Sequence, residues 1–292
     1  MAATLQPQPL TAGTRQSLFT FVSELARELS TGRIDLPSFP DAAARVQTVL
    51  SDDSVTGERI ARVVASDAGL AARILTMANS TLLHRGGPRV TELKTAITRI
   101  GHENIRTAAL TYATAQLRRA PDLAHIRTCL DQCWHEGVVV AALSRAIAKE
   151  AACVRMDEAM LAGLLHNIGK IYILARTPKD QAEYFGTDTE ELRSWHPGIG
   201  HALIENWKLG DDLANAVGGQ YEVDRSHAGQ PDLQDLLIVA VDMASQMAGH
   251  RTDDAAMARM PAAMALGLND AALVRIVLES KTDIEMLQAA LG

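Results

Sequence analysis

The chain of 292 residues has few aromatic residues and few cysteines. Aromatic residues make up 4% of the sequence, whereas Ala, Leu, Met and Arg, which lose little side-chain freedom in a helix, recur throughout. The cysteines number three, an odd count in a chain of this length, which indicates a reducing compartment rather than a disulfide framework. This composition predicts an all-α protein that folds without disulfides.

Long apolar runs and an excess of positive charge are also missing. The apolar runs at 137–143 and 236–241 are far shorter than the roughly 20 residues that span a bilayer. The net charge of -7 opposes a broad surface for nucleic acid or anionic lipid. Residues 1–10 lack the charged and apolar regions of a signal peptide. We therefore expect a cytoplasmic protein with a mobile leader over residues 1–14, no membrane span and no nucleic-acid partner.

Amphipathic periodicity runs along most of the chain. Apolar residues recur at spacings of three and four from Leu18 onward, and no segment shows the convincing alternation of a strand. The pattern predicts helices over 15–30, 40–50, 57–66, 68–83, 91–100, 102–119, 122–150, 157–175, 189–207, 210–221, 232–249, 254–266 and 270–290, the last with a break. The expected architecture is two helical lobes that share an interface.

The boundary between these lobes is expected at Ala120-Pro121-Asp122, where a proline follows the helix predicted over 102–119. This places an N-terminal helical bundle over residues 15–120 and a second helical lobe over residues 121–292.

The most informative stretch is 164–170, which reads Leu-Leu-His-Asn-Ile-Gly-Lys. It resembles a hydrolase metal motif in which the aspartate of a His-Asp pair is replaced by Asn167. A carboxylate supplies charge that holds a divalent cation and lowers the pKa of a bound water, whereas the Asn side chain is neutral. The chain therefore keeps the position of the pair and loses one charged ligand.

Several separated blocks, taken in order, resemble the HDOD family, which are helical relatives of the HD phosphohydrolases in bacterial signalling. The resemblance covers about 210 residues, from Leu36 to about Ala248. The blocks lie at 36–40, 60–80, 95–101, 104–106, 134–135, 162–170 and 196–200. The resemblance implies an N-terminal bundle packed on an HD-like lobe. It also implies a signalling role in which most members have no demonstrated catalytic need for the metal site.

The resemblance also implies four positions for a vestigial metal site, His135, His166, Asn167 and Asp242. In the related HD hydrolases a His on an earlier helix, an adjacent His-Asp pair and a distant Asp hold the metal. Asp242 carries independent weight, since it lies in an apolar helix where a buried carboxylate needs a partner. We interpret the set as a buried polar cluster that joins helices. The alternative is a set of ligands for a single divalent cation.

Two further signatures of active relatives are missing. Active members carry a His pair after the helix that follows the His-Pro block, whereas residues 217–222 here read Val-Gly-Gly-Gln-Tyr-Glu. The Gly-Tyr-Pro signature of cyclic-dinucleotide phosphodiesterases is absent as well.

His196 is expected to anchor the first turn of a helix with Pro197, and Lys170 is expected to be solvated.

These losses favour a non-catalytic regulatory module that acts on a signalling protein in trans and needs no cofactor, so no catalytic residue is assigned. One alternative is a metal-dependent phosphohydrolase with a mononuclear site at His135, His166 and Asp242. Another is a sensor that binds a nucleotide or cyclic dinucleotide in the residual cleft without cleaving it. The apolar helix at 17–29 either covers the protein's own core or supplies an interaction face.

Overall fold

A computed structural model describes residues 12–32, 41–50, 52, 54–80, 88–179, 189–249, 257 and 259–291. The described residues form helices and no strand, which confirms the predicted all-α fold. None of these helices is both long enough and apolar enough to cross a membrane.

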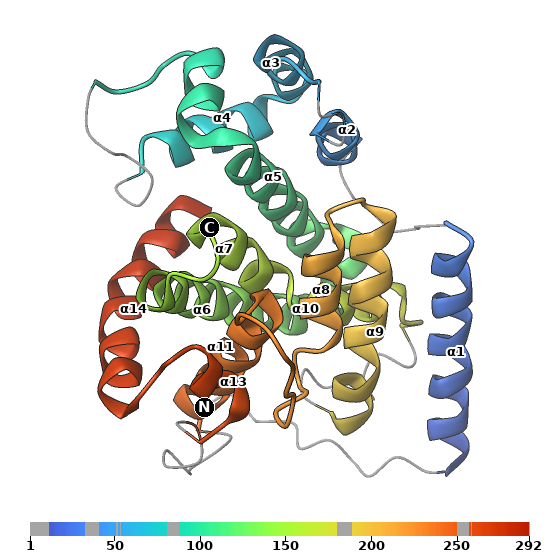
Figure 1. The fold of residues 1–292 in the computed structure, drawn as a ribbon. Helices are drawn as coiled ribbons and strands as arrows, with labels where there is room; N and C mark the ends of the chain where they lie inside the picture. The colour runs from blue at the N-terminus through green and yellow to red at the C-terminus, as the bar shows by residue number, and fades with distance from the viewer. Residues whose placement is uncertain are drawn as a thin grey trace, which may run out of the picture.

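The helices follow one another along the chain in the order labelled in Figure 1. They are α1 (Ala12–Ser30), α2 (Asp41–Leu50), α3 (Gly57–Ala65), α4 (Ala68–Ala78), α5 (Leu93–Arg119), the 3-10 helix η1 (Pro121–Ile126), α6 (Arg127–Ala151), α7 (Met156–Leu165), α8 (Ile168–Arg176), α9 (Glu190–Asn206), α10 (Asp211–Gly218), α11 (Leu233–Met247), α13 (Pro261–Ala265) and α14 (Asp270–Leu291).

Two hydrophobic cores organise these helices. The first core lies among α2, α3, α4 and α5, where Ile60, Val64 and Ile74 are fully buried, and it takes further residues from α6, α7 and α14. The second core lies among α6 to α14 and takes Leu110 and Leu117 from the second half of α5. In Figure 1, α5 runs from the first group of helices down to the second. The long helix α5 therefore joins the two cores.

Helix α1 packs with the second core although it comes first in the chain. Its apolar stripe of Leu18, Val22, Leu25 and Leu29 is buried, and the helix lies along α9 (Figure 1). Of the two uses considered for this stripe, the structure shows the covering of the protein's own core. The division at residue 120 stays a prediction. The buried residues of α1 belong to the second core, so α1 does not pack as part of the bundle of α2 to α5.

Other boundaries also differ from the expected ones. Helix α1 begins at Ala12, so residues 12–14 of the expected leader are helical, whereas residues 1–11 lie outside the described part of the chain. The segment 36–40 lies outside it as well. The helix expected over 122–150 opens as the 3-10 helix η1 before α6 begins.

Pro197 lies inside α9 rather than in its first turn, which makes the predicted role of His196 at a helix start wrong. Helix α9 begins at Glu190, with the Thr189 side chain accepting a hydrogen bond from the Leu192 backbone N–H. The helix continues through Pro197 although proline offers no N–H for the helical ladder.

The single helix expected over 157–175 is two helices, α7 and α8, which meet at His166 and Asn167. Two glycines allow the surrounding helices to approach this junction closely. A Cβ atom on Gly163 would lie 2.5 Å from the Ala141 Cα of α6, and one on Gly169 would lie 2.0 Å from the His196 carbonyl oxygen of α9. Backbone contacts this close exclude any side chain, so both positions require glycine.

We predict that Gly169→Ala lowers the free energy of unfolding by about 3 kcal/mol or more, because α8 and α9 must separate to accept the added methyl group. Gly198→Ala is the matched control, since Gly198 lies exposed in α9 with no atom within 4 Å of its Cβ position. Urea unfolding measures both. The control should be neutral or slightly stabilising, because Ala is the better helix former. Equal losses in the two variants would contradict the packing argument.

Candidate functional site

The junction of α7 and α8 is held by hydrogen bonds to backbone carbonyl groups. The buried His166 ring places Nδ1 2.6 Å from the Gly163 carbonyl oxygen, so this nitrogen carries the proton and donates it. Asn167 Nδ2 donates to the Cys133 carbonyl oxygen of α6 at 2.6 Å. Gln220 Nε2 donates to the His166 carbonyl oxygen at 2.8 Å. The junction is thereby tied to α6 and to the loop that follows α10.

A buried ion pair lies beside this junction. Lys170 in α8 is 2% exposed, and its Nζ lies 3.2 and 3.3 Å from the two carboxylate oxygens of Glu136 in α6. The remaining ring nitrogen of His166, Nε2, faces the same carboxylate at 3.6 Å. Glu136 keeps 38% of its side-chain area exposed, so the carboxylate forms the wall between the buried ammonium and solvent.

The pair keeps its charges. Burial alone would raise the pKa of Glu136, but His166 and Lys170 together hold it well below its usual range. Burial alone would lower the pKa of Lys170, but the Glu136 charge, with smaller contributions from Tyr221 and Cys133, keeps it above its usual value. At neutral pH the site therefore contains one carboxylate and one ammonium group.

A second imidazole completes this polar cluster. His196 Nε2 lies 3.0 Å from the Tyr221 hydroxyl, and the Arg193 guanidinium lies 4.7 Å from the centre of the Tyr221 ring. Burial, and then the charge of Lys170, lowers the pKa of His196 well below its usual value, so this ring is neutral. We call Glu136, His166, Lys170, His196 and Tyr221 the polar cluster.

Three buried polar atoms in this region have no hydrogen-bond partner among the described residues. They are His166 Nε2, His196 Nδ1 and Gln220 Oε1. The first follows from the geometry, since Nε2 meets only the Glu136 carboxylate and at a distance longer than a hydrogen bond.

The structure places the four predicted site residues in three surroundings. His166 and Asn167 are adjacent and buried. His135 is exposed, and its Nδ1 lies 3.3 Å from Gln288 Nε2 of α14. Asp242 is buried in α11 and accepts a hydrogen bond from Gln246 Nε2 at 3.2 Å. The ligand atoms of His135, His166 and Asp242 do not all lie within 4.8 Å of one another, so these three are not gathered as a ligand set.

The residues present do not fit the divalent cation that an HD site would hold. The Asn167 amide nitrogen is turned to a backbone carbonyl, and Lys170 places a buried ammonium on the carboxylate that faces His166. A metal there would have to displace this ammonium and would gain only one carboxylate and one imidazole. The assignment of a metal site to His135, His166, Asn167 and Asp242 stays a prediction with which this geometry disagrees.

Sequence reasoning missed Glu136 and placed Lys170 in solvent, which the structure shows to be wrong. Helical spacing contained a signal for Glu136. Glu136 lies three residues after Cys133 and four before Val140, both fully buried, so it shares their face of α6.

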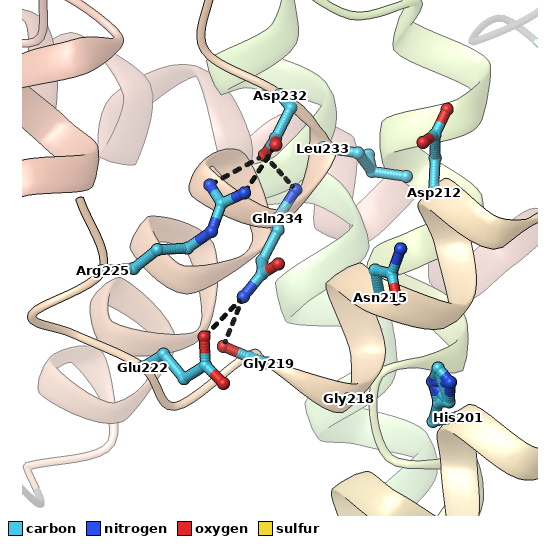
Figure 2. A pocket seen from close by; sticks show the side chains of 10 residues that line it. All are labelled: His201, Asp212, Asn215, Gly218, Gly219, Glu222, Arg225, Asp232, Leu233 and Gln234. Atoms are coloured by element: carbon cyan, nitrogen blue, oxygen red, sulfur yellow. Dashed lines mark hydrogen bonds and ion pairs between the residues drawn. The ribbon is translucent and has the colours of Figure 1, made fainter. Parts of the chain in front are cut away.

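A separate polar pocket of about 340 Å³ opens among α9, α10 and the start of α11 (Figure 2). Its lining includes the carboxylates of Asp212, Glu222 and Asp232, together with His201 and the amide of Gln234. Gln234 Nε2 donates to Glu222 Oε2 at 2.9 Å, which closes one side of the pocket.

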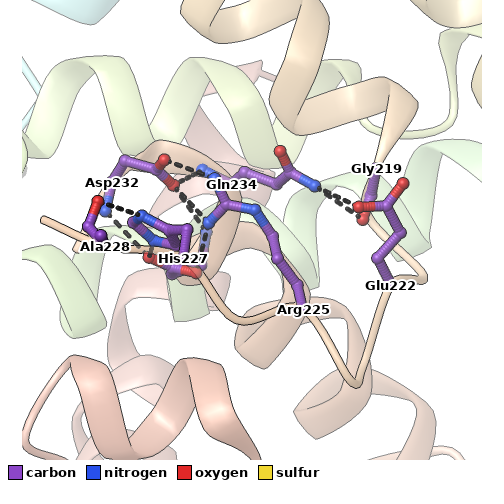
Figure 3. A network of polar contacts seen from close by, with 8 residues as sticks. Gly219, Glu222, Arg225, His227, Ala228, Asp232 and Gln234 are labelled. Atoms are coloured by element: carbon purple, nitrogen blue, oxygen red, sulfur yellow. Dashed lines mark hydrogen bonds and ion pairs between the residues drawn. The ribbon is translucent and has the colours of Figure 1, made fainter.

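An ion-pair network lies at the edge of this pocket (Figure 3). His227, Asp232 and Asp235 are the one group of three His, Cys, Asp or Glu residues, in the part of the chain that the structure describes, whose ligand atoms lie within 4.8 Å of one another. Arg225 already pairs with both carboxylates, and Asp232 and Asp235 form the capping box of α11. The cluster is therefore explained by the Arg225 charge and the helix cap.

Comparison with known proteins identifies the fold. The HDOD domain matches residues 36–223, more than half of the chain. The chain belongs to the HDOD family. No curated protein matches this HDOD chain in sequence.

Solved structures share the fold of this HDOD protein. An HDOD domain protein of unknown function from Geobacter sulfurreducens is 20% identical, with a TM-score of 0.63 over 94% of this chain and 99% of that one. A candidate metal-dependent phosphohydrolase from Shewanella amazonensis is 22% identical, with a TM-score of 0.64 over 92% of this chain and 99% of that one. A candidate signal transduction protein from Marinobacter aquaeolei is 17% identical, with a TM-score of 0.57 over 95% of this chain and 66% of that one.

We predict that Glu136→Gln lowers the free energy of unfolding of this HDOD protein by about 2 kcal/mol at pH 7. This is less than the roughly 3–5 kcal/mol for breaking a fully buried pair, because Glu136 is partly exposed. Glu205→Gln is the control, since the exposed Glu205 lies 3.6 Å from His201 and should change stability by less than about 0.5 kcal/mol.

The stabilisation from Glu136 should depend on pH in a defined window. The folded-state pKa of Glu136 is depressed, so its contribution is present above the ordinary glutamate pKa of about 4.3 and is lost as pH falls further. The folded-state pKa of Lys170 is raised, so the pair persists until pH rises beyond about 10.4. Urea unfolding should show a difference between wild type and Glu136→Gln that is present at pH 7 and declines as pH falls below about 4.3. A difference that does not decline below that pH would contradict the charge assignment.

Proposed function

We propose that this HDOD protein is a non-catalytic regulatory module that acts through contacts with a signalling protein in trans. The observation that carries the proposal is the Lys170 ammonium, which is buried against Glu136, the carboxylate that faces His166. A fixed positive charge inside the protein supplies no Lewis acid and activates no water. The Lys170 ammonium instead pairs with the Glu136 carboxylate.

The size of the electrostatic effect supports this conclusion. Two unit charges 4 Å apart interact by about 4 kcal/mol in a protein-like dielectric, and a divalent cation doubles this repulsion from the ammonium. The residues at positions 167 and 220 also disfavour a metal site. Asn167 contributes no charge, and Gln220, in the segment where active relatives have a His pair, donates to the His166 carbonyl group. The cluster thus joins α6, α8 and the loop after α10 instead of holding a reactive group.

The competing function is that of a metal-dependent phosphohydrolase. Its support is the fold shared with the Shewanella amazonensis protein, which at 22% identity concerns the fold alone. A catalytic site would have to be built from His166 and Glu136 after displacement of Lys170. The unpartnered His166 Nε2 is the atom that such a site would use.

Manganese titration separates the two functions. We expect wild type and Asn167→Asp to bind no stoichiometric Mn²⁺, because Lys170 repels the ion in both. The double variant, Lys170→Met with Asn167→Asp, also removes the ammonium. It should create a site of two carboxylates and one imidazole that binds Mn²⁺ at least tenfold more tightly than Lys170→Met alone or Asn167→Asp alone. Calorimetry measures the affinity, and circular dichroism confirms that each variant is folded.

Tight binding of one Mn²⁺ by the wild type, together with hydrolysis of a phosphodiester that His166→Ala abolishes, would overturn the proposal. Absence of turnover in the wild type with added Mn²⁺, Mg²⁺ or Fe²⁺ is the result that the proposal expects.

A further inference from the structure

A second hollow lies where α4, α5 and α14 meet. Its volume is about 360 Å³, which is within the range of small-molecule sites. Arg73 and Thr76 of α4, Tyr112, Gln116 and Arg119 of α5, and Ala289 of α14 contribute to its wall. None of these residues belongs to the polar cluster or to the polar pocket among α9, α10 and α11.

The charge of this hollow is opposite to that of the whole chain. Two guanidinium groups line it, and the lining residues that the structure describes include no carboxylate, although the net charge of the chain is -7. Burial, and then the nearby charge of Arg119, lowers the pKa of Arg73, which indicates that the two guanidiniums are close enough to repel each other. The hollow therefore offers two cationic side chains to a bound anion.

The acidic residue next to the hollow is already engaged. Asp67 caps α4 by accepting from the Leu70 backbone N–H at 3.0 Å, and it accepts from the Tyr112 hydroxyl at 2.9 Å. Gly69 allows this arrangement, since a Cβ atom there would lie 2.5 Å from the Tyr112 hydroxyl oxygen. The Tyr112 ring is thereby fixed against the first turn of α4 and forms a rigid part of the wall.

We propose that this hollow binds the phosphate group of a small phosphorylated ligand between Arg73 and Arg119. Guanidinium groups suit this task because they donate paired hydrogen bonds to phosphate oxygens and stay charged at every physiological pH. The Gln116 amide and the Thr76 hydroxyl offer neutral hydrogen-bonding groups in the same wall.

The position of the hollow gives such a ligand a structural effect. Helices α4 and α5 belong to the first core, and α14 extends from the second lobe to contact both of them. Leu287 of α14 is buried in the first core, two residues before Ala289 at the hollow. A ligand there would contact both lobes and stabilise the docking of α14. This inference does not depend on whether the polar cluster is catalytic.

Calorimetric titration of the full chain at low ionic strength tests the site with three probes: inorganic phosphate, a nucleoside monophosphate and a cyclic dinucleotide, each up to about 1 mM. Arg119→Met removes one guanidinium, and Ala72→Glu adds a carboxylate to the same wall while keeping both. Arg127→Met is the control, because Arg127 is exposed at the start of α6 and its loss changes the net charge by the same amount.

We expect at least one probe to bind, and Arg119→Met and Ala72→Glu each to weaken it about tenfold or more, with Arg127→Met within twofold of wild type. The probe that binds best identifies the source of the phosphate group. Binding of no probe would overturn the inference, as would equal weakening by all three variants, which would indicate nonspecific attraction. Unchanged melting temperatures of the unliganded variants show that a loss of binding is not a loss of folding.

Discussion

The ion pair between Glu136 and Lys170 is the interaction on which the interpretation of this HDOD protein depends. A lysine at 2% exposure is stable in charged form only because a carboxylate lies 3.2 Å away. The pair joins α6 to α8, and His166 completes the contact from the junction of α7 and α8. The ammonium is a fixed positive charge that pairs with the carboxylate facing His166.

Close helix packing places the members of this cluster. Gly163 and Gly169 lie on either side of His166, and each brings its helix into backbone contact with a neighbour. Gln220 then satisfies the His166 carbonyl group at the break between α7 and α8, and Asn167 donates to the Cys133 carbonyl group of α6. The motif at 163–170 is therefore a packing motif as much as a chemical one.

Much of the fold could be predicted from the sequence, because apolar residues at helical spacing report the buried faces of helices directly. The break at His166 could not be predicted, since the periodicity continues through it and the hydrogen bonds at the break reach residues distant in the chain, Cys133 and Gln220. The site was predicted in part. His166 and Asn167 lie in the buried cluster, whereas His135 is exposed and the adjacent Glu136 faces His166. One residue along a helix turns a side chain by about 100°, and a resemblance between blocks does not resolve that rotation. The burial of Lys170 depends on a partner 34 residues earlier, which local sequence does not reveal.

The central claim is that the Lys170 ammonium excludes a divalent cation from the polar cluster. The most direct measurement is the ¹H–¹⁵N resonance of the lysine ammonium groups, assigned with Lys170→Met, before and after one equivalent of paramagnetic Mn²⁺. The buried, paired ammonium of Lys170 should give a protected signal at neutral pH that keeps its intensity when Mn²⁺ is added. Selective loss of that signal at one equivalent of Mn²⁺ would place the ion within the cluster and contradict the account.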